Sequence, residues 1–155
     1  MPNVITVERT VTAPAAAVFA LLSDAANHPL LDGSGSVKSP RSGAAQPLNL
    51  GSEFGMSMKM GLPYATKNTV VEYEPNKRIA WKTEVSGPLG RVIGGRVWRY
   101  ELEPTGSSTR VRETWDISKD TLRPVLALTF SNKTRQDMER TLERIQEQVS
   151  VSPTS

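Results

Sequence analysis

The sequence predicts a single α+β domain, in which an antiparallel sheet precedes one long C-terminal helix. Three observations predict it. Apolar residues recur with the two-residue period of strands over residues 3–11 and over most of 54–117. Residues 125–149 contain neither glycine nor proline and space their apolar residues as a helix does. No linker separates two candidate cores within the 155 residues, so we assign 1–150 to one domain and expect 151–155 to fray.

The composition excludes several classes of protein. The chain has no cysteine and one histidine, which rules out disulfides and metal sites built from Cys or several His. We expect no metal and no cofactor. Nineteen Lys and Arg against sixteen Asp and Glu leave a net charge of +3, too small and too mixed in sign to indicate a nucleic-acid binder. Without a membrane-length apolar run or a signal-peptide pattern, we expect a cytoplasmic protein without a membrane span.

The first strand leads directly into the first helix. Ile5, Val7 and Val11 share one face of the strand, and Pro14 suits a first helical position because its missing N–H would have no partner there. Helical spacing then continues to about residue 24, and a short helical turn is expected over 26–31. The segment 32–50 is rich in glycine, proline and serine, so we predict a loop with a short strand at 36–38. A loop of this length is either functional or poorly ordered.

The pattern of residues 54–117 predicts an antiparallel meander, because short segments typical of turns separate the expected strands. The strands are expected at 54–60, 64–73, 79–85, 96–103 and 111–117. One face of this meander is apolar and aromatic, and it either fills a core or lines a ligand cavity. That face carries Phe54, Met56, Met58, Met60, Trp81, Trp98, Tyr100 and Trp115.

Glu113 is the most informative polar residue, since its parity places it inward with Val111, Trp115 and Ile117. A buried carboxylate must be paired, hydrated or protonated. It is therefore either an anchor or general acid/base for a ligand, or a structural partner of Arg96 or His28, unless a local bulge turns it outward.

The last helix is expected to run for 27–30 residues with Arg123-Pro124 in its first turn, about 40–45 Å. Its first part, residues 122–130, is apolar nearly all round, which predicts that protein or ligand surrounds it. Leu126 and Phe130 are its candidate contacts to a ligand.

Residues 5–29, ITVERTVTAPAAAVFALLSDAANHP, resemble the opening of the START-like, Bet v 1-type superfamily (SRPBCC), in its polyketide cyclase/dehydrase and lipid-transport branch. The later motifs EYEPNKRIAW (72–81), YELEP (100–104) and TRVRETWD (109–116) are similar to it too. The resemblance implies a helix-grip fold of six to seven strands around the last helix, with a cavity for an apolar ligand. Many relatives carry a tryptophan after the His-Pro position, where this chain has Leu30-Leu31. Asp32 and His28 lie where this fold usually opens, although a turn residue and a surface histidine are the plainer interpretation.

Three functions remain as hypotheses. The first is a carrier or binding protein for a hydrophobic small molecule such as a lipid or polyketide-like compound, acting as a monomer or homodimer. The second is a cyclase/dehydratase- or hydrolase-type enzyme, in which Glu113, Asp32, His28 and Tyr100 transfer protons. The third is a regulatory protein-interaction module that uses a basic outer face at Arg99, Arg110 and Arg112.

Overall fold

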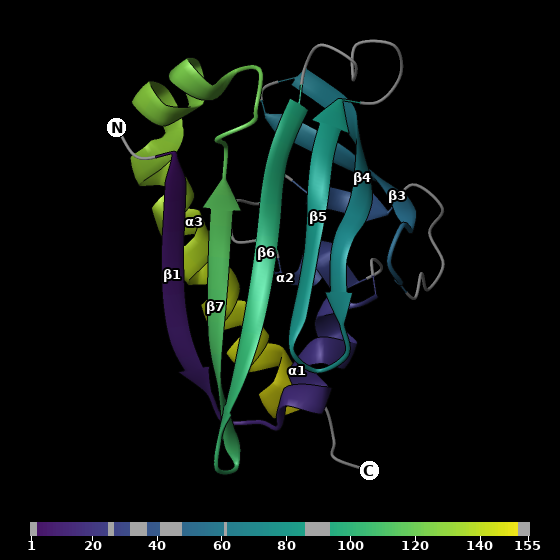
Figure 1. Ribbon diagram of the computed structural model, residues 1–155, viewed down its shortest axis with the longest axis vertical. Helices are drawn as coiled ribbons and strands as arrows, with labels where there is room; N and C mark the ends of the chain where they lie inside the picture. Colours follow the sequence, from purple (N-terminus) through teal and green to yellow (C-terminus); the bar gives the residue numbers. More distant parts are fainter. Residues whose placement is uncertain are drawn as a thin grey trace.

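The computed structural model describes residues 3–24, 27–31, 37–40, 48–60, 62–85 and 94–151. These residues form one curved antiparallel sheet with helices on one of its faces (Figure 1). The elements in chain order are β1 (Val4–Val11), α1 (Ala15–Leu22), α2 (His28–Leu31), β2 (Val37–Pro40), β3 (Glu53–Met60), β4 (Leu62–Glu74), β5 (Arg78–Val85), β6 (Gly94–Thr105), β7 (Ser108–Asp116) and α3 (Arg123–Val151).

The seven strands of the described chain lie in the order β1-β7-β6-β5-β4-β3-β2. From β2 to β7 each strand pairs with the next one in sequence, as a meander does. The first strand instead pairs with the last, with Val4 opposite Asp116 and Val11 opposite Thr109. Each pairing is antiparallel, which confirms the α+β helix-grip prediction and the predicted strand number.

The long helix α3 packs on the inner face of the sheet, against β1 and β7, and also contacts α1 and α2. Its buried stripe is Met138, Leu142 and Ile145, which are at most 1% exposed. These side chains share one core with Ile5, Val11, Val18, Leu22, Val111 and Ile117. Since burying each large aliphatic side chain contributes about 1.5–3 kcal/mol, this seam is a main source of stability.

Hydrogen bonds and two glycines fix the start of α3 to the start of β6. The Thr121 N–H donates to the Gly94 carbonyl (3.1 Å), and the Gly94 N–H donates to Thr121 Oγ1 (3.2 Å). Asp120 accepts from the Leu122 N–H (2.7 Å) and from Arg96 Nε (3.0 Å). Gly95 has φ +112°, and a Cβ there would lie 2.7 Å from the Lys119 carbonyl oxygen. Only glycine therefore fits this junction without strain.

Several element boundaries differ from the sequence predictions. The first helix covers Ala15–Leu22, and Pro14 precedes it as an extended N-cap residue (φ −69°, ψ 153°) that is not itself helical. The helical turn expected over 26–31 is α2, His28–Leu31, and the short strand expected at 36–38 is β2, Val37–Pro40.

The sixth strand begins earlier than predicted, at Gly94, inside the segment expected to be a loop. Gly94 pairs with Glu84 of β5 and bonds Thr121, and both Gly94 and Gly95 have positive φ angles. Glycines in this conformation occur in irregular strand ends as well as in loops, so the glycine-rich sequence predicted a loop here. The last helix covers 29 residues, within the predicted length.

Candidate functional site

Four rings from four different elements lie in contact on the inner face. The His28 ring of α2 stacks on Trp81 of β5, with ring centroids 4.7 Å apart and an interplanar angle of 23°. Phe54 of β3 meets both of these rings edge-on, at 5.3 Å from His28 and 5.8 Å from Trp81. Tyr100 of β6 continues the series at 5.6 Å from Trp81. The short helix α2 thus covers an aromatic row on the sheet.

His28 is held in this cluster by the end of α1. Its Nε2 lies 3.0 Å from the Leu22 carbonyl oxygen, and the side chain is buried. Because a carbonyl only accepts, Nε2 carries the hydrogen of this bond. His28 is therefore a buried ring of the inner face, in contrast to the surface histidine that the plainer interpretation expected.

A buried carboxyl lies beside the aromatic row. Glu113 of β7 is 2% exposed, and its register partners are Tyr100 of β6 and Val7 of β1. This confirms the inward orientation predicted from parity. Neighbouring Trp98 and Trp115 are also register partners, with ring centroids 6.3 Å apart.

Each of the two structural partners proposed for Glu113 makes a hydrogen bond to another group. Arg96 bonds Asp120, whose side chain is fully buried, at 3.0 Å. His28 bonds the Leu22 carbonyl.

Some candidate residues come together and others lie outside the described part of the chain. Phe54, Trp81, Tyr100, Trp115 and Leu126 are buried, and Trp98 packs against the same core. Asp32 is outside the described residues, as are the side chains of Met56, Met58, Met60 and Phe130.

The prediction that protein or ligand surrounds the start of α3 is wrong in part. Leu126 and Ala127 are buried, but Leu122, Val125 and Leu128 are exposed. Only one side of these first turns faces the core.

A buried polar group on the inner face was missed by the sequence reasoning. Asn68 of β4 is 4% exposed and donates to the Phe54 carbonyl (3.3 Å) and to Thr66 Oγ1 (3.2 Å). It accepts from Thr83 Oγ1 of β5 at 2.7 Å. The run Thr66–Thr69 contains only polar residues, so the sequence does not indicate which of them face the core. The inward orientation of Asn68 becomes clear only from its register partners, Phe54 and Thr83.

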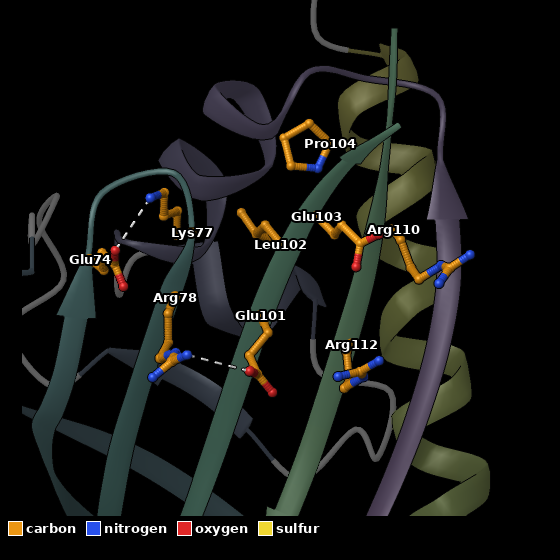
Figure 2. Close-up of a pocket in the computed structure, with 9 residues that line it drawn as sticks. All are labelled: Glu74, Lys77, Arg78, Glu101, Leu102, Glu103, Pro104, Arg110 and Arg112. Carbon is orange, nitrogen blue, oxygen red and sulfur yellow. Dashed lines mark ion pairs between the residues drawn. The ribbon is translucent and has the colours of Figure 1, made fainter. Parts of the chain in front are cut away.

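The opposite face of the sheet is charged and carries an open pocket of about 420 Å³ (Figure 2). Around it, Arg78 lies 3.7 Å from Glu101, and Lys77 lies 3.5 Å from Glu74. Such exposed pairs are weak and highly hydrated. The chemistry of this pocket does not suit a hydrophobic ligand.

Two of the three arginines proposed for a basic outer face are paired with carboxylates. Arg99 bonds Glu72, with Nε 3.0 Å from Oε1, and Arg112 bonds Glu8 at 2.6 Å. The hydrogen bond from Arg99 holds the pKa of Glu72 below its ordinary value of 4.5, against the opposing effect of burial. Most charges on the outer face are therefore paired with charges of opposite sign. This pairing removes most of the support for the hypothesis of a regulatory protein-interaction module with a basic outer face.

Neither a metal centre nor a membrane span is evident in the part of the chain that the structure describes. Within it, no three His, Asp or Glu side chains gather as metal ligands would. None of the described helices combines the length and apolar character needed to cross a membrane.

The sheet, the gripped helix and the aromatic inner face define a helix-grip protein. The chain belongs to the family described as polyketide cyclase / dehydrase and lipid transport, whose model matches residues 3–150. It is 41% identical over 108 residues to the uncharacterized protein Rv0088 of Mycobacterium tuberculosis. That match covers 68% of this chain but 44% of the relative, so the chain spans less than half of the relative's length.

Solved structures show the same fold at low sequence identity. A protein from Arthrobacter aurescens aligns with a TM-score of 0.75 at 13% identity, covering 99% of this chain and 88% of the other. Protein Ms6760 from Mycobacterium smegmatis aligns with a TM-score of 0.72 at 11% identity, covering 96% and 91%. These likenesses concern the fold.

Proposed function

We propose that this chain binds a hydrophobic small molecule, a lipid or a polyketide-like ring system, between the inner face of the sheet and α3, in the cytoplasm. The observation that carries the proposal is the aromatic row that runs from Phe54 through Trp81 to Tyr100 and ends beside the carboxyl of Glu113. Sites for small molecules combine an apolar lining with a few polar groups that fix orientation. The row supplies the lining, and Glu113 with Tyr100 supplies the polar end.

The polar end suits a ligand that carries a hydroxyl group. A carboxylate accepts a hydrogen bond from such a hydroxyl, and the Tyr100 O–H both donates and accepts. A hydrogen bond to a charged group contributes about 1.5–3 kcal/mol, so one such contact changes affinity by roughly tenfold to a hundredfold. The family description, which combines polyketide cyclases with lipid transport, supports this class of ligand.

The test is native mass spectrometry of the protein purified from its own host, followed by identification of any retained compound. We expect a small molecule with an apolar body and a hydroxyl. Glu113→Gln keeps the shape of the side chain and should weaken rebinding of that compound by at least about tenfold. Glu72→Gln on the outer face is the matched control and should leave rebinding unchanged.

Two results would count against the proposal. The first is a protein that retains no compound and takes up no apolar ligand after delipidation. The second is a bound compound whose affinity falls equally with Glu113→Gln and Glu72→Gln, because binding would then not depend on the inner face.

The alternative is a cyclase/dehydratase- or hydrolase-type enzyme acting on such a ligand. The observation that favours it is the pairing of Tyr100 and Glu113 on adjacent strands, which places two proton-transfer groups side by side in a buried setting. An enzyme would convert the retained compound, and Tyr100→Phe or Glu113→Gln would abolish conversion while the variants still bound it. A carrier would release the compound unaltered.

A further inference from the structure

The first turns of α3 and the residue immediately before this helix expose large apolar side chains. Leu122, Val125 and Leu128 are 37%, 54% and 68% exposed, whereas Leu126 and Ala127 on the other side of the helix are buried. Successive members of the exposed set are three residues apart, so they lie along one side of the helix. In Figure 1 these turns, drawn in green, lie at the end of the sheet where β1 begins. Contiguous apolar side chains at a surface are a common feature of protein or membrane interaction sites.

Basic side chains outnumber acidic ones along the chain around this patch. Among residues 117–136 the only acidic one is Asp120, whose side chain is fully buried and bonded to Arg96. The basic residues in the same stretch are Lys119, Arg123, Lys133 and Arg135, which are all exposed. Lys133 pairs with Asp137, whereas within the described residues Lys119, Arg123 and Arg135 form no salt bridge. The surface is therefore apolar and basic together.

We propose that this docking surface, formed by Leu122, Val125 and Leu128 with Lys119, Arg123 and Arg135, binds an anionic lipid bilayer. Apolar side chains on a helix enter the boundary between headgroups and acyl chains, and nearby cations are attracted to anionic lipids. The basic side chains of the docking surface complement the negative charge of an anionic bilayer, which favours a bilayer over other partners. A second copy of the chain would bring like charges together, and a nucleic acid would leave the three apolar side chains uncovered.

The structure holds this surface in a fixed orientation. The Asp120–Arg96 pair and the bonds between Thr121 and Gly94 join the start of α3 to β6. The surface consequently needs no folding step before it meets a membrane. The inference stands apart from the proposed ligand, since a chain that binds no small molecule could still dock in this way.

The experiment is sedimentation with sucrose-loaded vesicles of phosphatidylcholine, with and without 30% phosphatidylglycerol. We expect binding to the anionic vesicles that weakens in high salt and little binding to phosphatidylcholine alone. The double variant Val125→Asp/Leu128→Asp should lower the partition coefficient by about tenfold or more, because it removes the inserting side chains and adds negative charge. Leu50→Asp, at another exposed apolar position, is the matched control and should bind normally.

The contribution of charge is tested separately with Lys119→Glu/Arg135→Glu. This variant should lose most of its binding to anionic vesicles, whereas Arg110→Glu on the outer face should lose little. Circular dichroism verifies that each variant is folded. The proposal is overturned if the wild-type protein does not sediment with anionic vesicles, or if Leu50→Asp is as damaging as the double variant. It is also overturned if light scattering shows a dimer that Val125→Asp/Leu128→Asp dissociates, because the occupant would then be a second copy.

Discussion

Glu72 and Arg99, on the outer face of the sheet, form an ion pair in which each residue shifts the pKa of the other. The single Nε–H of Arg99 is shared between the two oxygens of the Glu72 carboxylate, at 3.0 and 3.1 Å, and Nη2 donates a further bond to Oε2. The pair lowers the pKa of Glu72 and raises that of Arg99, each because of the hydrogen bond to the other. The Glu72 side chain is 30% exposed, so water screens much of this interaction.

The pH dependence of Glu72 follows from the direction of its shift. A carboxyl whose pKa is lowered by folding stabilises the protein above its ordinary value of 4.5, and this contribution is lost as pH falls through the lower pKa of the folded state. Glu72→Gln should therefore destabilise the protein by less than about 1 kcal/mol at pH 7, with the difference shrinking below pH 4.5. Urea unfolding at both pH values measures it. A difference that grows in acid would contradict the assigned pair.

Among the elements, the junction between β6 and α3 depends most on backbone conformation. Gly95 combines a φ of +112° with the close approach of the Lys119 carbonyl, whereas Gly106 in the β6–β7 turn has φ +71° and open space around it. A comparison of substitutions at the two glycines therefore distinguishes the cost of backbone strain from the cost of a steric clash.

Substitution by alanine at these two positions should have unequal effects. Gly106→Ala should cost about 1 kcal/mol, because the left-handed conformation disfavours a Cβ. Gly95→Ala adds a collision with backbone and should cost roughly 2–4 kcal/mol. Denaturant unfolding of both variants gives the comparison. Equal costs would show that the junction relaxes around the new Cβ.

The sequence predicted most strands well because apolar residues alternate along one face of them, and parity alone placed Trp115 and Glu113 inward. It failed where structure depends on pairing between distant residues. Asn68 looks like a surface residue until Phe54 and Thr83 are known as its neighbours. Gly94 lies in a segment predicted to be a loop, although its pairing with Glu84 of β5 places it in a strand. The roles of the site residues stay a prediction, as does the single-domain boundary at residue 150.

For the whole molecule, stability depends on the seam between α3 and the sheet. Leu142 is 1% exposed in this seam, while neighbouring Glu143 is exposed on the other side of the helix. Leu142→Ala should lower the free energy of unfolding by about 2–5 kcal/mol, since it removes buried methyl groups and leaves a cavity. Glu143→Ala should change it by less than about 0.5 kcal/mol. Thermal unfolding checks both, and a small effect at Leu142 would indicate that α3 is loosely held.

The pairing of β1 with β7 has a consequence for biosynthesis. Val11 lies opposite Thr109, so the partner of the first strand is synthesised roughly 100 residues later. At about 5–20 residues per second, β1 waits some 5–20 s on the ribosome before that partner exists. During this interval its apolar side, with Ile5 and Val7, is exposed to solvent and to chaperones. The hairpins from β3 onward can form as they emerge, but the sheet is complete only after β7 has been synthesised.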